Sequence, residues 1–98
     1  MKKIAILGST GSIGQNGLKV IRHFPDKFRV VALSTDSNIN ILYKQIKEFS
    51  PLYVCVRDES SAKKLKGMLD CKTKVFSGEG GLEELVEKKE IEKVLLAI

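Results

Sequence analysis

Gly8-Ser9-Thr10-Gly11-Ser12-Ile13-Gly14 is the stretch that decides the fold of this 98-residue chain. Its three glycines stand at intervals of three residues, and they follow directly on the apolar run Ile4–Leu7. A short continuous apolar run that ends at a glycine is typical of a central strand buried on both faces. From Ser12 onward the apolar side chains are spaced as on one face of a helix. The stretch therefore predicts a tight turn between a buried strand and a helix.

The three glycines have different expected roles. Gly8 lets the backbone leave the strand, Gly11 leaves room for a diphosphate, and Gly14 lets the helix lie close to the sheet. The first interval is one residue longer than in the commonest dinucleotide fingerprint, so the match is to a variant of it. A Walker-type phosphate loop is excluded, because no Gly-Lys-Ser/Thr sequence closes the stretch. The alternative is a glycine-rich turn that binds no ligand.

Main-chain amides at this turn are the expected binding groups. The N–H groups from Gly11 to Ile13 and the positive end of the helix dipole are expected to face a pyrophosphate. The hydroxyl groups of Thr10 and Ser12 add donors at the same place. We therefore expect the dinucleotide to be bound by Thr10, Gly11, Ser12 and Ile13.

Strand and helix patterns alternate through the rest of the chain. The first helix is expected to end before Pro25 and to bury Ile13, Gly17, Val20, Ile21 and Phe24. Further strands are expected at 28–34, 52–56, 75–76 and 94–98, with a loop at 77–81. Helices are expected between them, the second capped from the polar cluster 35–38, the third by Asp58, and the last over 82–86.

This alternation predicts a doubly wound α/β fold with a Rossmann-like, mostly parallel sheet of about five strands. The chain ends inside an apolar strand, with no cap or polar tail. We therefore expect residues 1–98 to be a truncated, incomplete dinucleotide-binding domain, with the substrate, metal and C-terminal domains absent from this chain.

Composition excludes several classes of protein. Hydrophobic residues make up 43% of the chain and charged residues 30%, which excludes disordered, collagen-like and coiled-coil chains. The net charge of +5 is mild and spread along the chain, so no nucleic-acid partner is expected. Cys55 and Cys71 are too few for a disulfide scaffold, and no apolar run is long enough to span a membrane. A cytoplasmic protein with reduced thiols is expected.

The residues after the second expected strand bear on which dinucleotide binds. An acidic residue there takes the ribose hydroxyls of NAD, whereas a basic or small polar residue accommodates the 2′-phosphate of NADP. Asp36 favours NAD by repelling that phosphate, while the donors of Ser37 and Asn38 suit it. The residues alone leave both cofactors open, and Asp36 is as readily explained as a turn residue that points to water.

Catalytic and metal-binding residues are not expected within this chain. His23 is the single histidine, and it has no cysteine or carboxylate at metal-ligand spacing, so a surface position is expected. No Ser/His/Asp or Cys/His pair and no carboxylate cluster is evident. A hydride carrier needs a second partner that holds the substrate, and no segment here is long enough to provide one.

Three parts of the chain resemble the amino-terminal part of the 1-deoxy-D-xylulose 5-phosphate reductoisomerase family. They are Ile6–Gly14, Phe28–Leu33, and the set Asn38, Leu42, Gln45 and Glu48–Pro51. Together they extend the resemblance over nearly the whole chain. Aspartate-semialdehyde dehydrogenases have a related loop, usually with alanine or valine at the positions of Ser12 and Ile13, and they lack the later pattern.

The resemblance implies an NADPH-dependent oxidoreductase and isomerase. Such an enzyme converts 1-deoxy-D-xylulose 5-phosphate to 2-C-methyl-D-erythritol 4-phosphate in non-mevalonate isoprenoid biosynthesis. A divalent metal (Mg or Mn) and a homodimer are implied for the full-length enzyme, with the metal carboxylates, the substrate-phosphate groups and an active-site lid all beyond Ile98. This chain alone is therefore expected to bind cofactor and to be inactive.

The resemblance also implies which residues contact the cofactor. Thr10, Gly11, Ser12 and Ile13 would bind the dinucleotide, and Asn38 with the residues before it would contact the adenosine end. Many relatives have Gly-Lys before that asparagine, whereas this chain has Asp36 and Ser37. The missing lysine removes a positive partner for the 2′-phosphate, so Ser37 and Asn38 are the candidates on that side. Two other functions stay open, a non-catalytic NAD(P)-sensing regulatory module and the nucleotide domain of a semialdehyde-type dehydrogenase.

Overall fold

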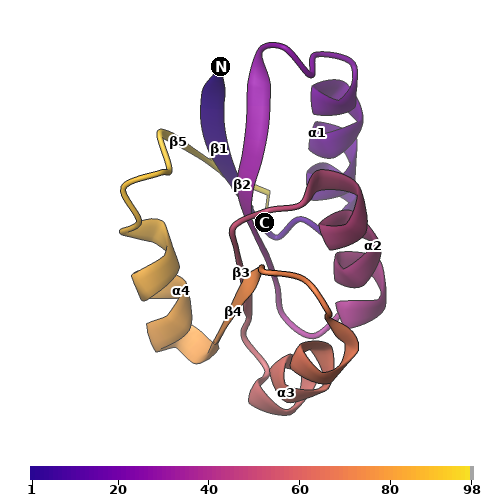
Figure 1. The fold of residues 1–98 in the computed structure, drawn as a ribbon, viewed down its shortest axis with the longest axis vertical. Helices are drawn as coiled ribbons and strands as arrows, with labels where there is room; N and C mark the ends of the chain where they lie inside the picture. Colours follow the sequence, from indigo (N-terminus) through magenta and orange to yellow (C-terminus); the bar gives the residue numbers. More distant parts are fainter. Residues whose placement is uncertain (98) are drawn as a thin grey trace.

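The computed structural model describes residues 1–97, which form a five-stranded sheet with helices on both faces (Figure 1). The elements alternate along the chain as β1 Lys2–Leu7, α1 Ser12–Arg22, β2 Phe28–Thr35, α2 Ile39–Phe49, β3 Tyr53–Val56, α3 Glu59–Met68, β4 Lys74–Ser77, α4 Gly78–Val86 and β5 Lys93–Leu96. The strand order is β4-β3-β2-β1-β5, and every neighbouring pair is parallel. The predicted doubly wound α/β fold is confirmed.

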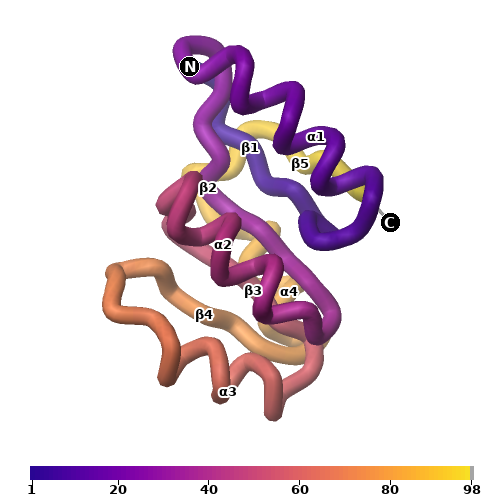
Figure 2. The backbone as a smooth tube through the Cα atoms, turned by 90° about the vertical axis from the view of Figure 1, so that its right-hand side faces the viewer, coloured from indigo at the N-terminus to yellow at the C-terminus, as the bar shows by residue number. Residues whose placement is uncertain are grey.

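Two hydrophobic clusters hold the helices against the sheet. On one face, α1, α2 and α3 cover side chains of β1, β2 and β3, and on the other face α4 does so alone (Figures 1 and 2). The larger cluster includes Ile6, Leu18, Leu33, Leu42 and Leu65, all 1% exposed or less. The smaller cluster is built from Ala5, Leu7, Ala32, Cys55, Phe76 and Leu85. Each central strand is thus buried on both faces, as its continuous apolar pattern predicts.

The chain order reverses at β1, and this fixes where a ligand can bind. From β1 the chain adds β2, β3 and β4 on one side, and then crosses back to place β5 on the other side. In open α/β sheets, ligands bind beyond the carboxyl ends of the strands at such a reversal. The loop after β1 lies at that point.

The buried face of α1 differs from the predicted one. Its buried residues are Gly14, Leu18 and Ile21, and of the expected set only Ile21 is among them. Three others are largely exposed, namely Ile13 (59%), Val20 (57%) and Phe24 (43%). The reason is that Gly14 packs on the loop after β1, and this contact sets the rotation of the helix. The prediction was wrong because it placed Ile13, Val20 and Phe24 on the buried face and left out Leu18, which is 1% exposed.

The loop expected at 77–81 is also wrong, because α4 already begins at Gly78. Three glycines in its first turn argue against a helix by intrinsic preference. Packing outweighs that preference at Gly81, where an added Cβ would lie 3.1 Å from Phe76 Cβ and 3.6 Å from Cys55 Sγ. The glycine therefore allows α4 to approach the sheet closely.

The fifth strand pairs with β1 and is exposed along its length. Leu96 is 66% exposed, whereas Ala97 is buried and donates its N–H to Leu7 O at 2.9 Å. The expected strand ran to Ile98, which lies outside the described residues. In the described part of the chain, no helix has both the length and the apolar character needed to cross a bilayer.

Candidate functional site

The turn between β1 and α1 has the geometry that its glycines predict. Gly8 adopts a φ of 80°, a left-handed conformation that favours glycine, and it turns the chain out of β1. An added Cβ on Gly14 would lie 2.3 Å from Gly8 O, so a larger residue does not fit there. The expected roles of Gly8 and Gly14 are both confirmed by these contacts.

Buried polar groups from β2 and α2 hold this turn in place. Gly8 N donates to Ser34 Oγ at 3.0 Å, and Ser9 N donates to Ser34 O at 2.9 Å. The side-chain amide of Gln45 forms two hydrogen bonds with Ser9. Its oxygen accepts from Ser9 Oγ at 2.7 Å, and its nitrogen donates to Ser9 O at 2.8 Å. Ser9, Ser34 and Gln45 are all buried. These buried side chains hold the turn in place before a ligand binds, so binding does not require them to rearrange.

The amino-terminal end of α1 is left open. Its N-cap is Gly11, no side chain caps it, and its first turn contains no acidic residue. The amides of Ser12 and Ile13 have no helical partner, and no described residue accepts a hydrogen bond from them. Gly11 N donates to Gly8 O at 3.3 Å, so the expectation that the Gly11 amide is also free was wrong. The main-chain amides without a partner therefore begin at Ser12, one residue later than predicted.

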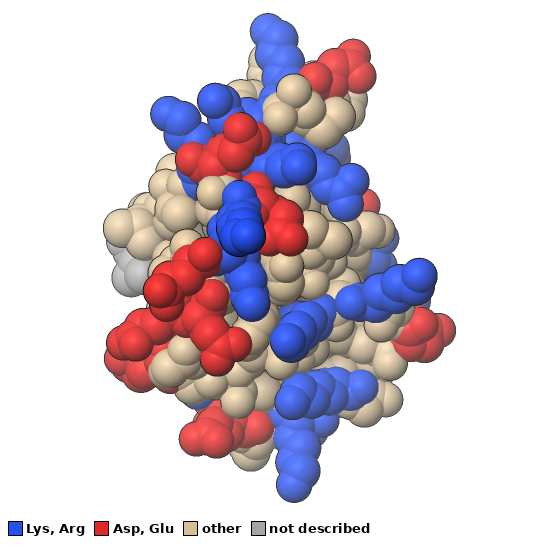
Figure 3. Space-filling view, turned by 60° about the vertical axis from the view of Figure 1, so that its left-hand side comes forward, with Lys and Arg blue, Asp and Glu red and all other residues tan. Residues whose placement is uncertain are grey.

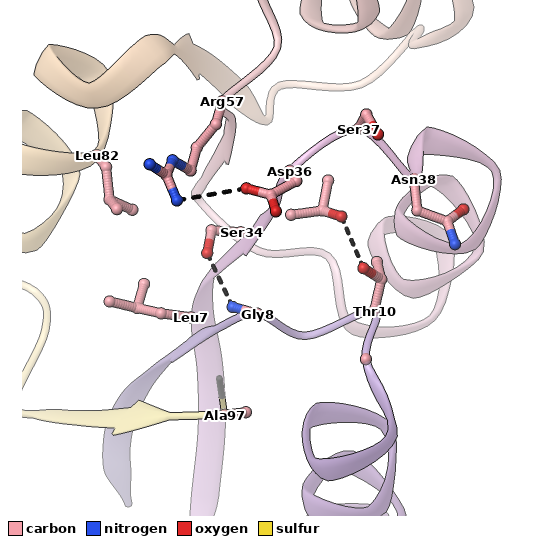
Figure 4. Close-up of a pocket in the computed structure, with 12 residues that line it drawn as sticks. Leu7, Gly8, Thr10, Ser34, Asp36, Ser37, Asn38, Arg57, Leu82 and Ala97 are labelled. Carbon is pink, nitrogen blue, oxygen red and sulfur yellow. Dashed lines mark hydrogen bonds and ion pairs between the residues drawn. The ribbon is translucent and has the colours of Figure 1, made fainter.

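A pocket of about 300 Å³ opens at the carboxyl ends of β1, β2 and β3 (Figure 4). Its lining comes from the β1 turn, the end of β2 and the start of α2, together with one residue each after β3, on α4 and after β5. These residues are Leu7, Gly8, Thr10, Gly11, Ser34, Thr35, Asp36, Ser37, Asn38, Arg57, Leu82 and Ala97. The pocket thus brings together four of the six predicted site residues, Thr10, Gly11, Ser37 and Asn38. Ser12 and Ile13 do not line it, and both have exposed side chains on α1.

Thr10 lies between the turn and β2. Its hydroxyl forms a hydrogen bond of 2.6 Å with the hydroxyl of Thr35, and either oxygen can be the donor. Its carbonyl accepts from Gln15 Nε2 at 2.7 Å. Because two hydroxyls carry two hydrogens and one bond uses only one of them, this pair keeps one donor for a ligand in the pocket.

Residues 36–38 form the side of the pocket that follows β2. Asp36, Ser37 and Asn38 are all exposed. Asn38 is the N-cap of α2, and its Oδ1 accepts from Ile41 N at 3.3 Å. The capping bond uses the oxygen of the Asn38 amide, which leaves its NH₂ group available as a donor.

Two residues of the site, Gln45 and Arg57, were missed by reasoning from the residues alone. Gln45 was named only as part of the resemblance to the family, and Arg57 was not among the predicted site residues. Arg57 directly follows β3, and its N–H donates to Thr35 O at 3.0 Å, which fixes it beside the end of β2. The signal that could have found Arg57 is its position, because the carboxyl ends of neighbouring parallel strands meet at one edge.

Side chains capable of covalent or metal chemistry do not gather in the pocket. Burial raises the pKa of the Cys55 thiol to about 11, so this thiol stays protonated at neutral pH. His23 is exposed at the C-cap of α1, at the other end of that helix from the pocket. Within residues 1–97, no three His, Cys, Asp or Glu side chains come together as a metal site. What the described residues offer at this edge is a set of donors for binding.

Charged side chains of both signs share the surface. Figure 3 shows acidic groups next to basic groups on the face that is turned forward from the left of Figure 1. Elsewhere, ion pairs of Arg22 on α1 with Glu48 on α2, and of Lys47 on α2 with Asp70 at 3.7 Å, also join the two signs. The positive excess is therefore not gathered into one basic surface on the face shown.

Comparison with known proteins gives one family. The family model for 1-deoxy-D-xylulose 5-phosphate reductoisomerase matches residues 4–98. The enzyme of that name from Thermodesulfovibrio yellowstonii is 48% identical over 98 residues, and the one from Caldanaerobacter subterraneus is 47% identical. Both alignments cover all of this chain, but only 26% and 25% of the relatives. The chain thus spans about a quarter of the length of these curated relatives.

Solved structures agree with the sequence comparison. A crystal structure of DOX-P reductoisomerase in complex with NADPH, fosmidomycin and magnesium superposes with a TM-score of 0.89 at 32% identity. It covers 100% of this chain, which corresponds to 24% of that chain. The reductoisomerase from Zymomonas mobilis in complex with NADPH gives a TM-score of 0.80 at 28% identity, over 85% of this chain and 22% of that one.

Proposed function

The chain belongs to the 1-deoxy-D-xylulose 5-phosphate reductoisomerase family, and from this premise we propose that it binds NADPH in the pocket beyond β1, β2 and β3. The observation that carries the proposal is the uncapped amino-terminal end of α1, where the main-chain amides of Ser12 and Ile13 have no hydrogen-bond partner among the described residues. Such a helix end attracts a diphosphate through its N–H groups and its dipole. The reductoisomerase structures that resemble this chain include complexes with NADPH.

The residues present fit the diphosphate and the adenosine ribose of the cofactor. The amides of Ser12 and Ile13 would hold the diphosphate, and the absence of a side chain on Gly11 lets it approach. The hydroxyl pair of Thr10 and Thr35 would donate to the same group. Ser37 and the NH₂ group of Asn38 would face the adenosine ribose. NADPH, when bound, supplies the hydride that a reductase transfers.

For the whole protein, we propose the activity of the family. This chain would be the NADPH-binding part of an enzyme that converts 1-deoxy-D-xylulose 5-phosphate to 2-C-methyl-D-erythritol 4-phosphate. Residues 1–97 offer no cluster of metal ligands, so magnesium or manganese and the phosphorylated substrate would be held by residues outside this chain. The same proposal includes a homodimer and a cytoplasmic location for the whole enzyme. Residues 1–98 alone would form an incomplete dinucleotide-binding domain that binds cofactor without turning over substrate.

Calorimetric titration of the chain with NADPH tests the proposed binding. Binding should be saturable, and Gly11→Val should weaken it roughly a hundredfold, or about 3 kcal/mol, because a branched side chain would stand where the diphosphate approaches. The fold should survive, since a Cβ on Gly11 has only one neighbour, Gly8 O at 3.7 Å. Equal affinity of the parent and the variant for NADPH would mean that the glycine turn does not contact the cofactor.

Activity is tested separately on a full-length enzyme that contains this chain. With a divalent metal and NADPH, it should consume 1-deoxy-D-xylulose 5-phosphate and oxidise the cofactor. The absence of turnover, in a preparation shown to bind both metal and NADPH, would contradict the activity while leaving the binding proposal standing.

A further inference from the structure

A single positively charged side chain, that of Arg57, lies among the described residues that line the pocket. Its side chain is partly exposed, at 43%. The backbone of Arg57 is fixed at the end of β3 by its N–H bond to Thr35 O. Figure 4 shows the side chain extending from β3 toward Asp36, the first residue after β2.

The position after β2 is where dinucleotide-binding domains distinguish NAD from NADP, because it faces the adenosine 2′ position. An aspartate alone at this position repels the 2′-phosphate of NADP. Here the carboxylate of Asp36 is paired with Arg57, whose NH1 lies 3.4 Å from Asp36 Oδ1. The charge of Asp36 is therefore offset by a group that can itself bind phosphate.

The contacts of Arg57 leave it able to change partners. Its NH2 donates to Glu79 on α4, so the guanidinium is held from one side, while NH1 faces Asp36. Both carboxylates are largely exposed, Asp36 at 81% and Glu79 at 76%. Exposed ion pairs contribute little to stability. A phosphate with more than one negative charge and three acceptor oxygens would compete well for the same guanidinium face.

Resting on the proposed binding of NADPH, we propose that Arg57 is the specificity-determining residue that selects the 2′-phosphorylated cofactor over NADH. The guanidinium exchanges the exposed carboxylate of Asp36 for the 2′-phosphate, and Ser37 and Asn38 add neutral donors beside it. Without Arg57, the charged side chain left among the described lining residues is that of Asp36, and the carboxylates of Asp58 and Glu79 lie beside it in the adjoining hollow. They would repel a phosphate, but they would not repel the ribose hydroxyl of NADH.

Titrations of the chain with NADPH and with NADH test this assignment through the ratio of the two dissociation constants. The parent should prefer NADPH. Arg57→Gln should lose about tenfold to a hundredfold in NADPH affinity while its NADH affinity changes by less than about twofold. Arg57→Lys, which keeps the charge but not the forked geometry, should retain part of the preference. The matched control is Arg29→Gln, which removes one positive charge from an exposed position near the other end of β2 and should leave both affinities unchanged.

Each outcome decides one of the two proposals. An unchanged NADPH to NADH ratio in Arg57→Gln, with a far-ultraviolet circular dichroism spectrum like that of the parent, would overturn the role of Arg57 and leave cofactor binding intact. A parent that prefers NADH would overturn it as well. A folded parent that binds neither cofactor at millimolar concentration would instead overturn the proposed function, and the role of Arg57 with it.

Discussion

The amino-terminal ends of α1 and α3 follow the carboxyl ends of β1 and β3, the two strands on either side of β2, but they are completed in different ways. At α3, the carboxylate of Asp58 accepts hydrogen bonds from Ser61 N at 3.0 Å, Ser61 Oγ at 2.6 Å and Ser60 Oγ at 3.0 Å. At α1, the N-cap is Gly11, and no side chain caps the helix. The end of α3 is satisfied by the chain itself, whereas the end of α1 is free to receive an external anion.

The two ends also differ in what holds them in position. Glu59 adds a second negative charge to the first turn of α3, whereas the first turn of α1 has no acidic residue. The turn before α1 is positioned instead by Ser34 and Gln45, through bonds to the backbone of residues 8 and 9. At α1, the residues that hold the turn in position do not cap the helix. The amides of Ser12 and Ile13 are therefore left without a hydrogen-bond partner among the described residues.

The largest expected effect comes from closing the space under α1. Gly14→Val should destabilise the chain by about 3 kcal/mol or more, because its Cβ would overlap Gly8 O, and a small domain has little stability in reserve. The matched control lies on α3, where Gly67→Val should be nearly neutral because nothing lies within 4 Å of an added Cβ. Urea unfolding followed by circular dichroism compares the two variants. Equal stability would mean that α1 does not pack on the turn as described.

A second prediction makes α1 resemble α3. Gly11→Asp should give α1 a cap of its own and raise the free energy of unfolding by a few tenths to about 1 kcal/mol. The backbone of Gly11 permits this, because its φ of −78° is accessible to any residue. The same carboxylate should lower NADPH affinity about tenfold or more by repelling the diphosphate. Gly11→Ala, which adds neither cap nor charge, is the control, and an Asp variant that binds as tightly as this control would contradict the account.

The smallest effect is expected at α3. Asp58→Ala should lower the urea midpoint slightly and leave the dissociation constant for NADPH within about twofold, since Asp58 caps a different helix. Hydrogen bonds from Ser61 hold the pKa of the Asp58 carboxyl below its ordinary value of 3.8. The stabilising effect of Asp58 should therefore be complete above pH 3.8 and be lost as the pH falls through the lowered value. The midpoints of parent and variant should converge in acid, and a gap that widens there would reverse the expected sign.

Sequence patterns were sufficient for the features that depend on near neighbours in the chain. The alternation of apolar runs predicted the parallel sheet, and the spacing of Gly8 and Gly14 predicted the turn that the structure contains. A cap from the cluster 35–38, which the structure places at Asn38, and the cap at Asp58 were likewise predicted from polar residues that precede helices. For the turn and the caps, the deciding contact lies within a few residues of the one that makes it, whereas the parallel sheet was predictable because alternating strands and helices imply parallel crossovers.

Features that depend on packing between distant segments were not predictable in this way. The rotation of α1 is set by the contact of Gly14 with the turn, which outweighs the pattern of its larger apolar residues. The start of α4 at Gly78 depends on packing against β4. Arg57 and Gln45 reach the site from β3 and α2, more than 30 residues from the glycine turn. Only the strand order brings these groups to the edge where the turn lies.

The most direct test of the account is to follow the backbone amides of the isotope-labelled chain by nuclear magnetic resonance while NADPH is added. The account predicts that the largest shifts appear at Ser12 and Ile13, with smaller ones at residues 36–38, and that the amides at the start of α3 barely move. Shifts centred away from the turn between β1 and α1, or none at saturating cofactor, would contradict it.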